Sequence, residues 1–275
     1  MEDEKPRFRN EYVIDQFEKL ADAITERVNV FMIGGGALIF HGLKEGTKDV
    51  DVIVQTPSEL KALISALYKI GYKSARRLPR EYEELGASII VENPDHFRWD
   101  IFHMQVANGL VLSENMITRS TVMFEKKGLA IHQMSKEDIF IFKSVTEREA
   151  DLEDMRVIAE AGIDWETVLR EIKNQSDSSG RLWENALYED LKELKKKHGI
   201  YSPIQKKVEN ALAKKLEERA VIRQLENGKR TIEEIASSSK ELSRSLIRSA
   251  LQRLEEKCKV TINRKRKPFV IHLKK

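Results

Sequence analysis

The sequence predicts an α+β protein in which a mixed sheet with flanking helices is followed by a helical domain and then by a small basic domain. Three patterns lead to this expectation. Short apolar runs alternate with amphipathic helical spacing up to about residue 134, helical spacing dominates to about residue 200, and the last part has the order helix, short helix, helix, hairpin. We therefore expect three domains, at residues 1–134, 135–203 and 204–275.

The first 134 residues predict an alternation of helices and strands. The apolar run Val28–Ile33 ends in three glycines, which indicates a buried strand that meets a tight turn. A later strand stops before Thr56, whose position ahead of Pro57 and Glu59 is typical of a capping box at a helix start. The expected helices cover 12–27, 37–42 and 57–70, and the expected strands cover 28–33, 50–54, 88–91, 97–103, 122–125 and 129–132.

The remaining residues predict helices that lead to a C-terminal hairpin. Ser135 and Asp138 indicate a further helix cap, and helical spacing continues to about residue 200 except for a Ser- and Gly-rich loop expected over 174–180. Thr231 and Glu234 have the spacing of another capping box. The helices of the last domain are expected over 216–225, 231–236 and 242–257, and the hairpin over 259–273.

Composition narrows the class of protein. The chain has 275 residues, of which 41% are hydrophobic, and no apolar run approaches the roughly 18 residues that a membrane helix needs. No secretory signal pattern precedes the first helix, so we expect a cytoplasmic protein. Cys258 is the single cysteine, which excludes an internal disulfide, and no Cys/His spacing suits zinc. A bound metal would therefore use carboxylates.

The net charge of +3 is unevenly distributed along the chain. Between Lys240 and Lys275 there are twelve Lys and Arg residues against three Glu residues, so this segment carries +9 and the rest of the chain −6. A basic segment of this kind indicates a polyanionic partner at the C-terminal end.

Glycines and carboxylates form the most informative pattern. Gly34 and Gly35 leave backbone N–H groups unobstructed near a helix start, which suits a phosphate. Asp49 and Asp51 are two residues apart at the start of a strand, so they share one face with Cα atoms roughly 7 Å apart. A later strand holds Asp100 between apolar neighbours, and we expect its side chain to face out. Three carboxylates so placed can hold one or two Mg²⁺ (or Mn²⁺) ions and catalyse phosphoryl transfer.

Each of these features has a simpler interpretation when it is taken alone. Aspartates at strand ends often cap turns, and an Asp-x-Asp pair is often a solvated edge of a sheet. The combination of a glycine turn, a spacer, an Asp-x-Asp pair and a later lone strand aspartate is hard to obtain from turn chemistry. The combination therefore favours a metal site.

In this order the residues resemble the nucleotidyltransferase superfamily, which includes DNA polymerase beta and many small "minimal" nucleotidyltransferases. The resemblance extends over residues 28–103. It implies the nucleotidyltransferase fold, catalysis by Asp49, Asp51 and Asp100 as the ligands of Mg²⁺ or Mn²⁺, and a nucleoside triphosphate (NTP) as substrate. Within the superfamily the chain looks closest to the AbiEii-type branch, whose toxin members have a sheet domain followed by a helical one. This implies a toxin–antitoxin-like protein.

The same resemblance implies further residues of a nucleotide site. Gly34 and Gly35 would seat the phosphates, and Thr47 would shape the loop that follows, although a plain turn hydroxyl explains Thr47 equally well. Lys143 would reach the phosphates beside Asp151. A charge in the apolar surroundings of Lys143 also favours a site.

One position departs from the AbiEii-type pattern. Ala150 stands where that branch has a lysine, which leaves the nucleotide and the level of activity open. The alternative interpretation of this segment is a helix with ordinary ion pairs, such as Arg148 with Asp151.

The C-terminal segment resembles winged helix-turn-helix domains over about 55 residues. In that arrangement six basic residues occupy contact positions, Arg244 and Arg248 at the exposed start of the recognition helix and Arg264, Lys265, Arg266 and Lys267 at the wing tip. Basic groups at such positions bind nucleic-acid phosphates. Winged helices also serve as dimerisation or docking modules, so a homodimer stays open beside nucleic acid.

The combined expectation is an enzyme that transfers a nucleoside monophosphate from an NTP to an acceptor, RNA or protein, and releases pyrophosphate. The acceptor would attack the α-phosphate in line, with its proton passing to Asp100. An alternative of another class is a DNA-binding transcriptional regulator whose first domain senses a nucleotide or is inactive. A third is nucleotidylation of an antibiotic or other small molecule, which would not need the basic segment.

Overall fold

The structure is a computed structural model that describes residues 7–74, 87, 89–107, 109–146, 148–239, 241–265 and 267–274. The chain divides into two compact units, Met1–Gln205 and Lys206–Lys275. The predicted α+β class, a mixed sheet with flanking helices followed by helical segments, is confirmed. The finer domain boundaries stay a prediction. Each helix of the described part is too short or too polar to span a lipid bilayer.

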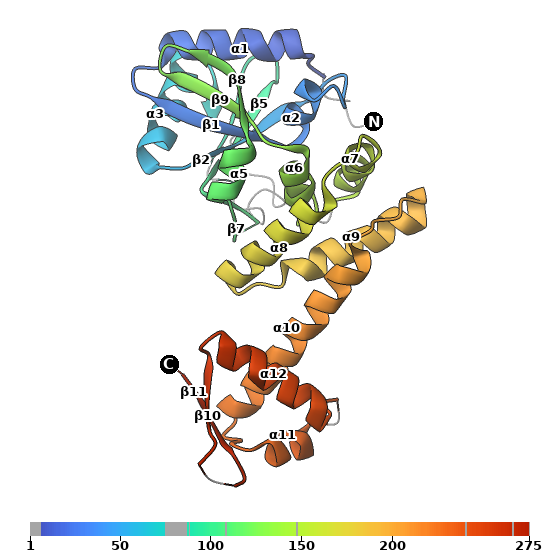
Figure 1. Cartoon of the computed structure of the whole chain (residues 1–275). Coiled ribbons are helices and arrows are strands. Elements are labelled where there is room, and N and C mark those ends of the chain that lie inside the picture. Colours follow the sequence, from blue (N-terminus) through green and yellow to red (C-terminus); the bar gives the residue numbers. More distant parts are fainter. Residues whose placement is uncertain are drawn as a thin grey trace. The chain divides into compact units, whose positions relative to one another are not determined.

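A mixed sheet forms the centre of the first unit. Its strands, with the short pair β6 and β7, are β1 (Val28–Ile33), β2 (Asp49–Val54), β3 (Lys73–Ser74), β4 (Ile89–Glu92), β5 (Arg98–His103), β6 (Gln105–Val106), β7 (Leu110–Val111), β8 (Thr121–Lys126) and β9 (Leu129–Gln133). In the described part, seven strands have the order β3-β4-β5-β2-β1-β9-β8 (Figure 1). β2 is parallel to β5, β1 is parallel to β9, and the other neighbours are antiparallel. The predicted strands are confirmed, apart from residue 88, which lies outside the described residues.

The two faces of the sheet differ at its centre. Val50 and Val52 of β2 are fully buried and share a face with Trp99, the register partner of Val50. Helix α1 (Asn10–Ala23) packs against this face, where the Phe17 ring lies 5.6 Å from that of Trp99. Because side chains alternate along a strand, the intervening β2 positions project to the opposite face. Strand alternation thus separates an aromatic core from the face that carries the aspartates.

Helix α3 (Pro57–Lys69) begins with the predicted capping box, which is confirmed. The Thr56 hydroxyl accepts a hydrogen bond from the Glu59 backbone at 3.1 Å, and the Glu59 carboxylate accepts one from the Thr56 backbone at 3.1 Å. The same carboxylate accepts from the backbone N–H of Asn29. This second contact joins the start of α3 to β1, on which the helix packs.

Helix α2 (Gly34–Phe40) begins earlier than the sequence predicts. The three glycines were expected to form a turn ahead of a helix over 37–42, and they form the first turn of the helix instead. Gly34 has φ +67°, so the chain changes direction at this residue without a separate loop. The glycine backbone therefore lies directly at the end of β1.

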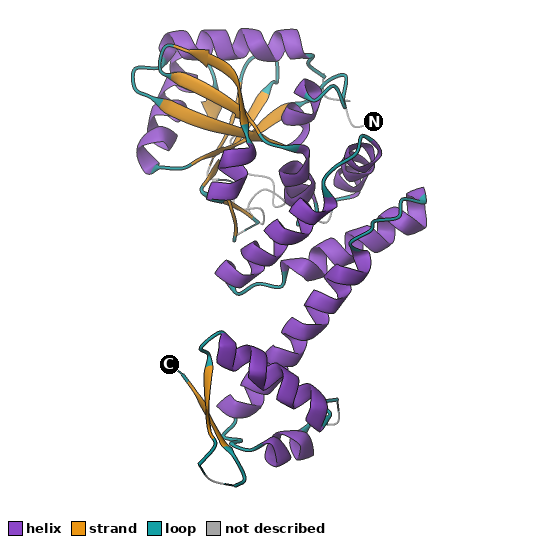
Figure 2. Cartoon of the chain, viewed as in Figure 1, coloured by secondary structure: helices purple, strands orange, loops and turns teal. Residues whose placement is uncertain are grey.

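Helices follow the sheet to the end of the first unit (Figure 2). They are α5 (Glu114–Arg119), which precedes β8, then α6 (Lys136–Lys143), α7 (Glu149–Glu160), α8 (Trp165–Ser179) and α9 (Trp183–His198). The predicted loop over 174–180 is wrong, because α8 continues to Ser179 and ends at Gly180. Gln175 explains the difference, since its buried amide exchanges two hydrogen bonds with the backbone of Val111, at 3.0 and 2.8 Å. Tertiary contacts here override weak helix propensity.

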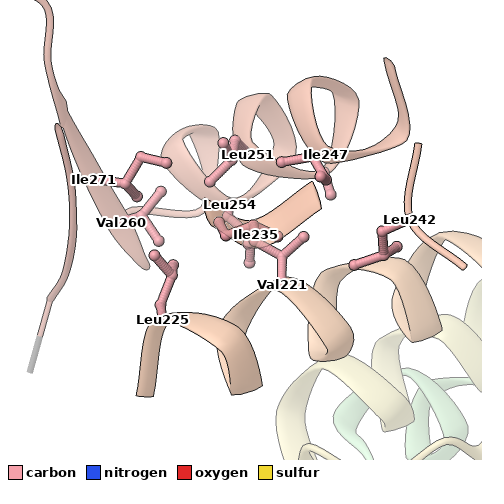
Figure 3. Close-up of a cluster of buried hydrophobic side chains, with 10 residues drawn as sticks. Val221, Leu225, Ile235, Leu242, Ile247, Leu251, Leu254, Val260 and Ile271 are labelled. Carbon is pink, nitrogen blue, oxygen red and sulfur yellow. The ribbon is translucent and has the colours of Figure 1, made fainter. Parts of the chain in front are cut away.

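The described residues of the second unit form three helices and a hairpin in the predicted order. They are α10 (Gln205–Glu226), which is longer than predicted, α11 (Ile232–Ser238), α12 (Arg244–Glu256), β10 (Val260–Asn263) and β11 (Val270–Leu273). The capping box of Thr231 and Glu234 is confirmed. Apolar side chains from the helices, the hairpin and the α11–α12 connection meet in one core (Figure 3). Its buried members are Val221, Leu225, Ile235, Leu242, Ile247, Ala250, Leu251, Leu254, Val260 and Ile271.

A buried network of charges joins three helices of the first unit. Arg119 of α5 donates to Asp138 of α6 at 2.6 and 3.1 Å and to Glu171 of α8 at 2.8 Å. Both carboxylates are at least 99% buried. A buried ion pair is costly to break from one side, because the remaining charge has no partner. Since α6 also carries Lys143 and packs on α2, this network positions Lys143 near the glycines.

Replacing Arg119 with Met should lower the free energy of unfolding by about 3–5 kcal/mol, because two buried carboxylates lose their counter-charge. Arg156→Met is the matched control. Arg156 pairs with the exposed Glu153 and Glu160 on α7, where loss of an ion pair costs far less because water solvates the remaining charges. Urea denaturation at neutral pH measures both variants. Equal losses would contradict the role assigned to the network.

Candidate active site

Three carboxylates lie on one face of the sheet, where β2 and β5 run side by side in parallel. Asp51 is the register partner of Asp100, and Asp49 is the partner of Arg98. Adjacent strands lie about 4.8 Å apart, and register partners project to the same face. The structure therefore brings the three predicted catalytic residues together, with Arg98 among them.

The glycines of α2 lie directly against this group. A Cβ built on Gly34 would be 2.1 Å from Oδ2 of Asp51, a distance that two such atoms cannot adopt. A Cβ built on Gly35 would be 3.0 Å from Oγ1 of Thr47. The Thr47 hydroxyl donates to the backbone oxygen of Asp49 at 2.7 Å and so shapes the approach to β2. The predicted phosphate-seating backbone and the aspartates are thus immediate neighbours.

Arg98 bridges two of the carboxylates. Its Nη2 donates to Oδ2 of Asp100 at 2.7 Å and to Oδ2 of Asp49 at 3.0 Å. The side chain of Asp100 projects to the face opposite Trp99, as strand alternation requires, but it is fully buried. The prediction that Asp100 faces out is therefore wrong as far as solvent is concerned, because Asp100 forms a buried ion pair.

The carboxylates oppose one another's ionisation. Burial, reinforced by the charge of Asp49 and opposed by Lys143, raises the pKa of Asp51 to about 7. Burial also raises the pKa of Asp100 well above its ordinary value, and the charges of Asp51 and Asp49 act in the same direction. A cation bound between such groups is favourable because it removes their repulsion.

A second charged cluster joins α6, α7 and the connection before β2. The Lys143 ammonium contacts Asp151 and lies 2.9 Å from Oδ2 of Asp154. Lys44 binds the other oxygen of Asp154 at 2.5 Å, and Arg148 binds Asp151 at 2.6 Å. Three cations and two carboxylates therefore alternate in one network.

Lys143 links the two clusters. It is only 7% exposed, and although burial lowers its pKa, the charges of Asp151, Asp154 and Asp51 outweigh burial and raise it. Lys143 and Asp151, both predicted for the nucleotide site, thus lie beside the predicted catalytic carboxylates. The Arg148–Asp151 ion pair of the alternative interpretation is present too, so the two interpretations do not exclude each other.

Both clusters contribute to one pocket of about 460 Å³. Pockets for small ligands commonly measure about 300–1,000 Å³. Ala150, the position that departs from the AbiEii-type pattern, lies in its wall, whereas the fully buried Asp100 does not line it. The charged lining residues are Arg7, Lys44, Lys48, Asp49, Asp51, Lys143, Arg148, Asp151, Glu153 and Asp154.

The oxygen donors suit a hard divalent cation. Oδ1 of Asp100 is buried and has no hydrogen-bond partner among the described residues. Carboxylate oxygens are the ligands that Mg²⁺ and Mn²⁺ prefer. Among the described residues, no three His, Cys, Asp or Glu side chains are close enough together to hold a metal ion in their present positions. Arg98 binds one oxygen of Asp49 and one oxygen of Asp100. The residues fit the cation chemically, with Arg98 as its competitor.

Sequence reasoning did not assign Arg98 or Lys44 to the site. Alternation along β5 gives a signal for Arg98, because it projects to the same face as Asp100. Lys44 lies in the connection between α2 and β2, whose path no pattern in the sequence determines. Its contact with Asp154 could not be found without the fold.

Two of the predicted nucleic-acid contacts lie at the start of α12. Arg244 is the first residue of the helix and Arg248 follows one turn later, and both are exposed. The Ser243 side chain caps the helix by accepting from the backbone of Leu246 at 3.3 Å. The start of α12 is therefore capped by its own chain, and it exposes two arginines to solvent.

The other predicted contacts belong to the hairpin. The Arg264 guanidinium makes two hydrogen bonds to Glu255, at 2.8 and 2.5 Å, so its charge is already compensated. Lys265 and Lys267 are exposed, and Arg266 lies outside the described residues.

Comparison with known families agrees with this geometry. Residues 11–201, which are more than half of the chain, match the family described as "Nucleotidyltransferase of unknown function (DUF6036)". The chain therefore belongs to this family of nucleotidyltransferases, and the predicted superfamily is confirmed. No curated protein matches the sequence. The AbiEii-type branch stays a prediction.

Gly34→Ala should disrupt the site more than its backbone strain alone explains. The new Cβ would clash with Oδ2 of Asp51, and φ +67° disfavours Ala by about 1–2 kcal/mol. Gly42→Ala is the matched control, because Gly42 has φ +70° and no atom within 4 Å of its built Cβ. Urea denaturation should show a larger loss of unfolding free energy for Gly34→Ala. Equal losses would contradict the close approach of Gly34 to Asp51.

Stability should depend on pH through Asp51. Its folded pKa of about 7 exceeds the value of about 3.9 in an unfolded chain, so the folded state binds more protons between these values. The free energy of unfolding should therefore fall as the pH rises from about 4 to about 7 in buffer with EDTA. Asp51→Asn should reduce this fall, as urea denaturation at several pH values would show. An unchanged pH profile in the variant would rule out the raised pKa.

Proposed function

We propose that the protein transfers a nucleoside monophosphate from an NTP to an acceptor, RNA or protein, with Mg²⁺ or Mn²⁺ as cofactor and release of pyrophosphate. The observation that carries the proposal is the register of β2 and β5, which puts Asp51 beside Asp100 on the face that Gly34 approaches. Family membership supports nucleotidyl transfer in general.

The position of each residue indicates its role in the proposed reaction. Asp49, Asp51 and Asp100 would hold the cation, which supplies positive charge for the phosphates and lowers the pKa of the attacking hydroxyl. The backbone N–H groups of Gly34 and Gly35 would donate to phosphate oxygens. A new bond forms between the acceptor oxygen and the α-phosphorus, the bridging bond to the β-phosphate breaks, and pyrophosphate leaves.

The proton of the acceptor hydroxyl needs a base close to the reacting oxygen. Asp100 would take this role, because its Oδ1 has no hydrogen-bond partner among the described residues and can accept a proton. Arg98 would compensate Asp100 and Asp49 until a cation competes for them. Its guanidinium keeps the carboxylates close together despite their repulsion.

The cationic side of the pocket would contact the triphosphate. Lys143, Lys44 and Arg148 line the pocket together with Asp151 and Asp154, which bind all three cations. In this arrangement Asp151 and Asp154 position the cations, and the phosphates attract them from the pocket side. Lys44 thereby offers a positive charge in a wall where Ala150 offers none.

We assign nucleic-acid binding to the second unit as a winged-helix module. Its support is the element order, the exposed Arg244 and Arg248 at the start of α12, and the charge of +9 between Lys240 and Lys275. The unit would place an RNA acceptor, and binding through phosphates would weaken as salt rises. A protein acceptor would not need this charge.

The second candidate function is a DNA-binding regulator that senses a nucleotide or has lost catalysis. Two observations favour it. Asp100 already forms an ion pair with Arg98, and Lys143 already forms ion pairs with Asp151 and Asp154, so these charges are compensated without a metal ion or a nucleotide. A protein of this kind would bind DNA without transferring a nucleotide.

Transfer of label from each α-labelled NTP to total RNA and protein, with Mg²⁺ or Mn²⁺, tests the proposal. The Asp49→Ala/Asp51→Ala double variant should lose labelling by on the order of 100-fold or more, because both residues are proposed metal ligands. Substitution of residues that only hydrogen-bond to metal ligands already costs about 10–100-fold. Asp15→Ala is the control, because Asp15 is an exposed carboxylate on α1 that pairs with Lys19. Labelling should persist in this control.

The outcomes separate the two candidates. Labelling that depends on Asp49 and Asp51 and also on added metal establishes the transferase and identifies its nucleotide and acceptor. Salt-sensitive DNA binding that survives both substitutions, with no labelling by the wild type, overturns the transferase and supports the regulator.

A further inference from the structure

The second unit contains a pocket that has no role in the packing of the core and none yet in the proposed binding of phosphates. It lies among α11, α12 and the hairpin and measures about 520 Å³. Leu251 and Ile271, which belong to the core, form part of its lining together with Ile232 and Ile262. Figure 3 shows Leu251 on α12 and Ile271 on β11 within that core. The pocket therefore opens a path from the surface down to apolar side chains.

The polar lining of this pocket is mainly basic, with Arg248, Arg264 and Lys267 beside Glu233 and Gln252, and it includes one aromatic ring. Arg248 comes from α12 and Lys267 from the hairpin connection, and both side chains are exposed. Neither makes an ion pair with a carboxylate of the described residues, whereas Arg264 is held by Glu255. Phe269 also lines the pocket and is 38% exposed. Two cations without an ion-pair partner among the described residues thus line an apolar hollow with an exposed ring, in a lining whose one carboxylate is Glu233.

A ligand that contacts Arg248, Lys267 and Phe269 together needs a flat apolar body and negative charges beside it. A nucleobase with its two flanking phosphates has this composition. The volume falls within the range of about 300–1,000 Å³ that is common for small-ligand pockets. Grooves that bind single strands combine basic side chains for the backbone with aromatic rings for the bases.

We propose that this pocket receives one unpaired nucleobase of a nucleic-acid strand, with Phe269 against the face of the base and with Arg248 and Lys267 at the adjacent phosphates. This inference rests on the proposed binding of nucleic acid by the second unit. It goes beyond that proposal by naming the partner as a strand with at least one unpaired base rather than a regular duplex.

A regular duplex would leave the pocket unused. Paired bases are stacked in the interior of a duplex, and a protein reaches only their edges in the grooves. The cations of the lining would then contact phosphates while Phe269 and the apolar lining stayed in water. An unpaired base can leave the stack and bury its face against the ring, which commonly strengthens binding by about 5- to 150-fold.

Fluorescence anisotropy of the full chain tests the inference with three labelled probes of equal length: a single-stranded RNA, the same strand with abasic sites, and an RNA duplex. The wild type should bind the intact single strand most tightly. Phe269→Leu, which removes the ring and keeps an apolar side chain, should weaken that binding by about 5- to 150-fold. It should leave binding of the abasic strand and the duplex unchanged, and Phe269→Tyr should restore the wild-type affinity.

Two controls separate this effect from a general one. Leu216→Ala removes an exposed apolar side chain from α10, outside the pocket, and should change none of the three affinities. Lys267→Ala should weaken all three probes and reduce the salt dependence of log Kd by about one unit, as loss of one phosphate contact does.

The results that overturn the inference differ from those that overturn nucleic-acid binding. Equal affinity for the intact and abasic strands, or a Phe269→Leu effect that is as large on the duplex, overturns the base pocket and leaves nucleic-acid binding in place. If no probe binds the wild type even at low salt, nucleic-acid binding by the second unit and the base pocket both fail. That result would not contradict nucleotidyl transfer to a protein acceptor.

Discussion

The parallel pairing of β2 with β5 is the constraint on which the candidate site depends. The pairing sets Asp51 beside Asp100 and Asp49 beside Arg98, so like charges are held closer together than they would lie in an unfolded chain. The free energy of the folded sheet maintains this proximity, because the carboxylates themselves oppose it, as the raised pKa values of Asp51 and Asp100 indicate. The proposed function would require this local arrangement, which the rest of the fold must stabilise.

The compensation for this repulsion comes from two directions. Arg98 acts within the sheet, and Lys143 acts from α6, where Asp151 and Asp154 hold it in turn. The position of α6 depends on the buried contact of Arg119 with α6 and α8, so helices outside the sheet complete the charge balance of the site. Buried ion pairs often contribute little net stability compared with apolar contacts, whereas removal of one partner is costly. These networks therefore hold the carboxylates and cations of the candidate site in one arrangement.

Much of this site could be predicted from residue spacing. The glycines after a buried strand and the Asp-x-Asp pair have a chemical reason at each position, and strand alternation put Asp49 and Asp51 on one face. The burial of Asp100 and the contact of Lys44 could not be predicted, because they depend on which strands and connections become neighbours in space. The expected loop over 174–180 failed for the same reason, since distant contacts of Gln175 kept that segment helical. Local patterns gave the residue types, and tertiary contacts decided their partners.

The charge distribution bears on the choice of acceptor. Residues outside the segment from Lys240 to Lys275 carry a net charge of −6, and Asp49 and Asp51 line the pocket. The pocket itself has no net charge, since Arg7, Lys44, Lys48, Lys143 and Arg148 stand against Asp49, Asp51, Asp151, Glu153 and Asp154. It therefore offers a polyanionic acceptor no net attraction, so the attraction for the proposed RNA acceptor would have to come from the segment with +9. A protein acceptor without a large negative charge would have no use for that segment. The charge asymmetry is thus what an RNA acceptor would need, and its physical consequence for such an acceptor is transfer whose rate falls as salt rises.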